Sequence, residues 1–113
     1  MDIYPLLTSM VEKGASDLFI TAGVPPSIKL NGKVVPISNT PLSPEATREA
    51  VLSIMNEDQR KEFVKTKELN FAVSARGVGR FRASAFYQRN LAGIVIRRIE
   101  THIPQIDDLG LPD

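Results

Sequence analysis

Two strands are predicted by the stretch GRFRASAFYQRNLAGIVIRRI, which occupies residues 79–99. Apolar and polar residues alternate from Gly79 to Gln88, with the period of two that sends successive side chains to opposite faces of a sheet. The turn at residues 88–90 leads into a second strand over residues 91–99. The alternation divides the first strand into a polar and an apolar face: Arg80, Arg82 and Ser84 on one, and Phe81, Ala83, Ala85 and Tyr87 on the other.

The second strand carries two adjacent arginines, which must point to opposite faces. Arg97 shares its face with Val95 and Ile99, whereas Arg98 shares the other face with Ile94 and Ile96. A slip of one residue in the pairing exchanges the two faces. The spacing alone therefore leaves open which of the two arginines lies beside Arg82.

Four more strands are predicted upstream of this pair. A strand over residues 69–75 joins the pair through the turn Arg76-Gly77-Val78-Gly79, and an earlier strand covers residues 17–21. The dipeptide Asn31-Gly32 predicts a hairpin between strands at residues 27–30 and 33–37, because a type I′ turn needs positive φ at both central positions.

Three helices are predicted from apolar spacing and end signals. The first is capped by Asp2, tolerates Pro5 in its first turn and ends at Gly14. The second opens at Ser43-Pro44-Glu45, and the third opens at Asn56 with Gln59 reaching back to it. Their predicted buried residues are Ile3, Leu6, Leu7, Met10 and Val11 in the first, Thr47, Ala50, Val51, Ile54 and Met55 in the second, and Phe63 and Val64 in the third.

Helices and strands are segregated along the chain, which favours a single α+β domain with an antiparallel sheet flanked by helices. We assign this domain to residues 1–100 and a linker to residues 101–113, where two prolines and a glycine interrupt any period. We expect a further domain to follow the linker. His102 and the pair Asp107-Asp108 fall in this linker and are interpreted as solvated residues.

The composition excludes several classes of function. The chain has 113 residues, no cysteine and one histidine, which removes multi-histidine metal sites and leaves little material for a Ser-His-Asp triad. There is no phosphate loop, and Gly77-Val78-Gly79 is interpreted as a hairpin turn. We predict no catalytic residue and no metal site in this segment. No signal peptide and no spanning helix are recognised, so a cytoplasmic protein is expected.

Charge is unevenly distributed along the chain. Residues 69–99 contain six arginines and no lysine or acidic residue, whereas the rest holds eight basic and thirteen acidic residues. Arginine suits bidentate contacts with phosphate or carboxylate, so a local anion site is one interpretation. The alternative is a solvated sheet face whose arginines pair with the acidic helices. Nucleic-acid binding is disfavoured, because the net charge is +1 and Phe81 and Tyr87 lie opposite the arginines.

The chain resembles the N-terminal region of the type IV pilus retraction ATPases, the PilT/PilU group. The resemblance rests on GASDLFITAGVPP at residues 14–26, GRFRASAF at 79–86, IVIRRI at 94–99 and LGLP at 109–112. The stretch at residues 86–91 and the doubled Arg97-Arg98 are more similar to PilU than to PilT.

The resemblance implies a PAS-like N-terminal domain of a hexameric ATPase whose nucleotide-binding core follows the linker. It implies that Arg82 and Arg97, with Arg80 as a further contributor, contact the nucleotide held by that core. Arg98 departs from the commoner pattern and leaves the assignment on the last strand open. ATP and Mg would be used by the full-length protein, with none tightly bound by this segment.

The resemblance also implies partners and a location. The partners would be the chain's own C-terminal ATPase domain, neighbouring subunits of a homo-hexamer, the inner-membrane pilus platform and a paralogous retraction ATPase. The location would be cytoplasmic, peripheral to the inner membrane. The alternative function is a PAS-like sensor of a small ligand or a protein-interaction domain. On the nucleotide hypothesis we predict the register that places Tyr87 opposite Ala92, because it puts Arg82 and Arg97 on one face.

Overall fold

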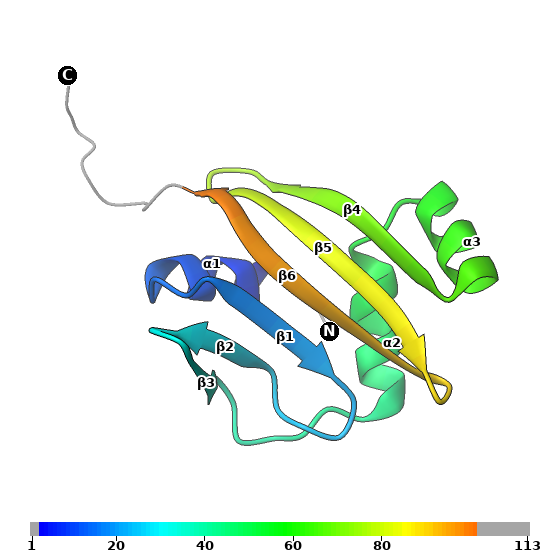
Figure 1. The fold of residues 1–113 in the computed structure, drawn as a ribbon, viewed down its shortest axis with the longest axis horizontal. Helices are drawn as coiled ribbons and strands as arrows, with labels where there is room; N and C mark the ends of the chain where they lie inside the picture. Colours follow the sequence, from blue (N-terminus) through cyan, green and yellow to red (C-terminus); the bar gives the residue numbers. More distant parts are fainter. Residues whose placement is uncertain (1–2, 102–113) are drawn as a thin grey trace.

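Six strands form one antiparallel sheet in the order β3-β2-β1-β6-β5-β4, and three helices accompany it (Figure 1). The computed structural model describes residues 3–101. The elements are α1 (Tyr4–Glu12), β1 (Asp17–Thr21), β2 (Ser27–Leu30), β3 (Lys33–Pro36), α2 (Pro44–Ser53), α3 (Glu57–Thr66), β4 (Glu68–Ala75), β5 (Gly79–Gln88) and β6 (Leu91–Thr101).

The α+β class and the order of the elements are confirmed. Helices α1 and α2 lie behind the sheet in Figure 1, and α3 lies near the start of β4. The boundaries differ by one or two residues: β3 stops at Pro36, and β6 continues to Thr101, two residues beyond the predicted end. The rest of the predicted linker, with His102 and Asp107-Asp108, lies outside the described residues, and the finer PAS-like assignment stays a prediction.

Two hairpin turns use consecutive residues with positive φ. Asn31 and Gly32 have φ of 51° and 81°, which confirms the predicted turn between β2 and β3. Arg89 and Asn90 have φ of 55° and 63° and connect β5 to β6 with Gln88 opposite Leu91. Turns of this kind match the natural twist of the strands, so each fixes the register of its hairpin.

The helix ends follow the sequence signals with one exception. Ser43 caps α2 by accepting the Ala46 amide at 3.0 Å, and Asn56 and Gln59 form a reciprocal capping box on α3. Gly14, with φ of 75°, ends α1 as predicted. The N-cap of α1 is Ile3, which makes no side-chain bond, whereas the predicted cap Asp2 lies outside the described residues.

The core lies between the sheet and the helices, and most of its predicted members are buried. Phe63 of α3 is fully buried and stacks on Tyr87 with ring centroids 4.7 Å apart. The prediction for Val64 is wrong, because this side chain is 50% exposed. One residue is a turn of about 100° around a helix, so Val64 points away from the sheet that Phe63 contacts. The fully buried side chains of largest volume are Phe63, Phe81, Ile3, Leu7, Met10, Leu18, Ile20, Ile28, Ile94, Ile96, Val51 and Thr47.

Candidate functional site

The pairing of β5 with β6 brings two arginines directly opposite each other. Tyr87 pairs with Ala92, as predicted, and the same register sets Arg82 opposite Arg97. Both side chains therefore point to one face of the sheet, the face opposite the buried residues Phe81 and Ile96. Among the described residues, no helix covers this face, which we call the open face (Figure 1).

Arg82 and Arg97 line a shallow cavity of about 460 Å³ on the open face. Asn70 of β4, Ser84 of β5 and Val95 of β6 complete its lining. The Ser84 hydroxyl donates to the Asn70 carboxamide oxygen at 2.7 Å, so these two side chains hold each other in place. The cavity thus combines two guanidinium groups with neutral polar groups, a combination that suits an oxyanion such as phosphate.

A buried carboxylate stands beside this pair. The side chain of Asp17 on β1 is 7% exposed, and its Oδ2 accepts a hydrogen bond from Nε of Arg97 at 3.2 Å. Its Oδ1 accepts the Ser16 hydroxyl at 2.6 Å. The alternative that the arginines pair with the acidic helices is therefore wrong for Arg97, whose partner is on the neighbouring strand. Asp17 was not singled out in the sequence analysis, because no local pattern indicates that β1 lies beside β6.

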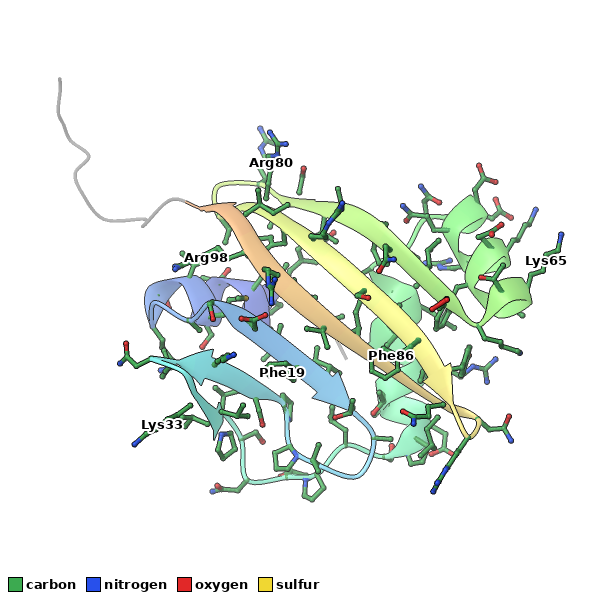
Figure 2. All side chains as sticks on the ribbon, viewed as in Figure 1. Phe19, Lys33, Lys65, Arg80, Phe86 and Arg98 are labelled. Carbon is green, nitrogen blue, oxygen red and sulfur yellow. The ribbon has the colours of Figure 1, made fainter. Side chains whose placement is uncertain are left out.

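The other two arginines of the last hairpin lie apart from the cavity. Arg80 is exposed and shares the open face with Arg82, but it is not among the residues that line the cavity. Arg98 is half-buried and lies opposite Phe81, which places it on the helix-covered face. Figure 2 shows Arg80 at the end of the sheet where β4 and β5 meet, and Arg98 on the side of α1. Of the two candidates on β6, Arg97 is the one that accompanies Arg82.

The open face also carries an apolar part, which the sequence analysis did not single out. Phe19 of β1 and Phe86 of β5 are half-buried and lie on this face on either side of β6 (Figure 2). The Phe86 ring lies so close to Gly93 that a Cβ there would be 2.6 Å from the ring. The alternation of side chains along β5 already placed Phe86 on the same face as Arg82 and Ser84, so the position of Phe86 could have been predicted from the sequence.

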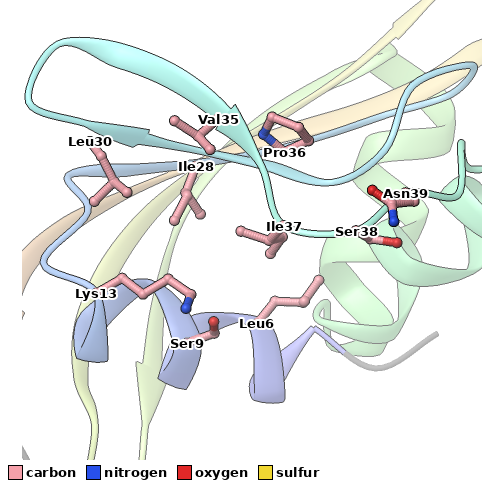
Figure 3. Close-up of a pocket in the computed structure, with 10 residues that line it drawn as sticks. All are labelled: Leu6, Ser9, Lys13, Ile28, Leu30, Val35, Pro36, Ile37, Ser38 and Asn39. Carbon is pink, nitrogen blue, oxygen red and sulfur yellow. The ribbon is translucent and has the colours of Figure 1, made fainter.

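A larger groove lies on the helix side of the sheet, between α1 and the β2–β3 hairpin. It measures about 670 Å³ and is lined by apolar residues from both elements (Figure 3). Figure 3 shows Lys13 and Ser9 of α1 on one wall, facing Ile28 and Ile37. The predicted arginines take no part in it, so the groove is a separate candidate for ligand binding.

Among residues 3–99, whose side chains the structure describes, no group of three or more His, Cys, Asp or Glu gathers in a way that could hold a metal ion. No helix in this range is long and apolar enough to cross a membrane.

Comparison with known proteins gives close relatives. No family model matches the chain. It is 66% identical over 113 residues to the type IV pilus ATPase PilU of Pseudomonas aeruginosa, covering all of this chain and 30% of that protein. It is 40% identical over 111 residues to the type IV pilus retraction ATPase PilT of the same organism, covering 98% of this chain and 32% of that protein.

A solved structure agrees with these relatives. The crystal structure of the pilus retraction motor PilT with bound ADP superposes with a TM-score of 0.81 at 37% identity. The match covers 100% of this chain and 33% of that one. The chain thus spans about a third of the length of the curated relatives it matches.

Proposed function

This chain is an N-terminal domain of the PilT/PilU type of pilus ATPase, and from that premise we propose that it supplies Arg82 and Arg97 to a nucleotide held by an ATPase core. The observation that carries the proposal is the register of β5 and β6. It aligns the two guanidinium groups across one exposed cavity of about 460 Å³. Arg80 stays a further candidate contact on the same face.

The proposed role is electrostatic. Phosphoryl transfer depends mainly on positioning and on stabilising negative charge, and an arginine supplied from outside the phosphate-binding loop can provide both. Two arginines on neighbouring strands of one sheet move as a unit, so approach of the open face to the nucleotide would deliver both charges together. We propose that this approach couples ATP hydrolysis to rotation of the domain relative to the core.

The wider assignments rest on the relatives. The solved PilT structure contains ADP, which supports the use of ATP by the full-length protein. We propose that Mg accompanies the ATP. We propose that the domain works within a homo-hexamer of pilus ATPases, next to its own C-terminal domain and neighbouring subunits. We further propose that the hexamer acts at the cytoplasmic side of the inner membrane, on the pilus platform and together with a paralogous retraction ATPase. Tight nucleotide binding by the isolated domain is not expected.

The test is the loss of each arginine in the full-length protein. Arg82→Gln and Arg97→Gln remove charge and keep length, and each is expected to lower kcat for ATP hydrolysis by roughly tenfold or more. The matched control is Arg48→Gln, an exposed arginine on α2. The double variant should abolish pilus retraction. Full hydrolysis and retraction by the double variant would refute the proposal.

The groove of Figure 3 supports the second candidate, a ligand-binding or protein-interaction domain. Its volume falls in the range typical of small-molecule sites, and its lining combines apolar side chains with the cation Lys13 and polar groups such as Ser9. The two functions are separable, because the groove and the arginines are on opposite faces of the sheet. A Leu6→Glu variant should leave ATP hydrolysis unchanged if the groove binds a ligand or partner unrelated to the nucleotide, while retraction in cells is lost.

A further inference from the structure

We propose that Asp17 is the positioning residue of Arg97, holding its guanidinium in the orientation that receives an oxyanion; the inference rests on the proposed function. Arg97 is a long side chain that is 72% exposed, so without a partner it would sample many rotamers. Asp17 is 7% exposed and belongs to the rigid centre of the sheet. The ion pair therefore ties a mobile group to a fixed one.

Asp17 contacts one of the three guanidinium nitrogens of Arg97, and this choice determines which nitrogens remain available to a ligand. Asp17 Oδ2 accepts from Nε of Arg97, the nitrogen nearest the backbone. The four N–H bonds of the two terminal nitrogens are left, and among the side chains of residues 3–99 the structure shows no acceptor for them. A carboxylate that bound the terminal nitrogens would instead compete with phosphate for the same donors. The observed contact fixes the plane of the guanidinium while leaving its outer edge for a ligand.

The carboxylate is itself held in place. Ser16 donates its hydroxyl hydrogen to Asp17 Oδ1 at 2.6 Å, so the two carboxylate oxygens have separate partners. The backbone adds a second tie, because the Arg98 amide donates to the Ser16 carbonyl at 3.1 Å. The chain of contacts thus runs from Ser16 through Asp17 to Arg97 and joins the start of β1 to the end of β6.

The negative charge of Asp17 also offsets the repulsion between the two arginines of the site. The register aligns Lys29, Asp17, Arg97 and Arg82 in one row across β2, β1, β6 and β5. Like charges directly opposite in a sheet repel, which applies to Arg82 and Arg97. Asp17 is the acidic member of this row and lies between two cations. Its negative charge allows the two guanidinium groups to stay close together without a bound anion.

The first test uses the full-length protein and steady-state ATP hydrolysis. Asp17→Asn keeps the shape of the side chain and removes its charge, and we expect kcat/KM for ATP to fall by about tenfold, since a charge-assisted contact is lost. Asp17→Glu restores the charge and should recover part of the rate. The control Asp58→Asn, at an exposed position on α3, should match the unmodified protein.

A double-mutant cycle separates positioning from general support of the fold. If Asp17 acts through Arg97, then Asp17→Asn costs nothing further in the Arg97→Gln background. Equal losses in both backgrounds would show a structural role and overturn the inference. A normal rate for Asp17→Asn beside an impaired Arg97→Gln would overturn the inference and leave the proposed function standing. A normal rate for Arg97→Gln would refute the proposed function itself.

The second test reads the contact without activity. In the 113-residue chain, the Nε–H signal of Arg97 in NMR should exchange with water at least about tenfold more slowly than that of Arg48, because it is hydrogen-bonded to a buried carboxylate. Asp17→Asn should remove most of this protection. Added pyrophosphate should shift the Arg97 terminal signals more than those of Arg48. Equal exchange at the two arginines in the unmodified chain would overturn the inference.

Discussion

The two faces of the central strands differ in what their side chains do. On β5, Phe81, Ala83 and Ala85 are buried against the helices, whereas Arg82 and Ser84 on the alternate positions are exposed. One strand thus belongs to the core through one face and to the candidate site through the other. The covered face, which packs against the helices, stabilises the fold and holds the backbone still, so that the open face can present charged groups in a fixed array.

The largest loss of stability is expected when a buried side chain on the covered face is truncated. Phe81 is fully buried at the centre of the sheet, so Phe81→Ala removes its transfer free energy and leaves a cavity. We expect the free energy of unfolding to fall by about 3–5 kcal/mol, measured by urea denaturation of the 113-residue chain. A decrease in the free energy of unfolding below about 1 kcal/mol would mean that the helices do not bury this face.

The open face is closely packed at Gly93. A Cβ at this position would lie 2.6 Å from Cε1 of Phe86 and 3.0 Å from Cγ2 of Thr21. Gly93→Ala therefore forces the Phe86 ring aside, and we expect a loss of about 1–3 kcal/mol in the same denaturation experiment. The control is Gly93→Ala in a Phe86→Ala background, where most of the cost should disappear. An unchanged cost in that background would point to the backbone or to Thr21 and not to the ring.

The sequence predicted most of the covered face and only part of the open face. The local sequence patterns were each confirmed: the alternation of polar and apolar residues on β5, the turn at Asn31-Gly32 and the helix caps at Ser43 and Asn56. The pairing of Asp17 with Arg97 joins residues 80 positions apart, and it follows from β1 lying beside β6. Strand order in a sheet is set by tertiary packing, which no local pattern contains.

The turn between β5 and β6, and not the spacing of the residues, determines that Arg97 is the neighbour of Arg82. Spacing left Arg97 and Arg98 equivalent, and the two-residue turn at Arg89 and Asn90 decided between them by fixing the register. The prediction for Val64 was wrong because a short helix packed at the edge of a sheet buries a narrow stripe of its surface. On α3 that stripe holds one fully buried residue, Phe63.

The covering helices themselves offer a smaller perturbation. Ser43 accepts the Ala46 amide at 3.0 Å and so caps the first turn of α2. Ser43→Ala leaves that amide without its side-chain acceptor, and we expect a loss of about 1 kcal/mol. Ser43→Asp should retain the cap and serve as the control. Because α2 packs behind β6, the arginines of the open face should keep their NMR signals in both variants if the two faces are independent.

The smallest expected effect on stability is at the site itself. Arg82 is exposed and lies directly opposite Arg97, so Arg82→Gln removes a like-charge neighbour and leaves the core untouched. We expect the free energy of unfolding to rise by a few tenths of a kcal/mol, to a limit of about 0.5 kcal/mol. The gain should shrink at about 1 M salt, where the screening length is roughly 3 Å. Arg48→Gln on α2 should show no such gain. A loss above about 1 kcal/mol for Arg82→Gln would mean that this arginine stabilises the sheet. The two faces of the sheet would then not differ in the way described.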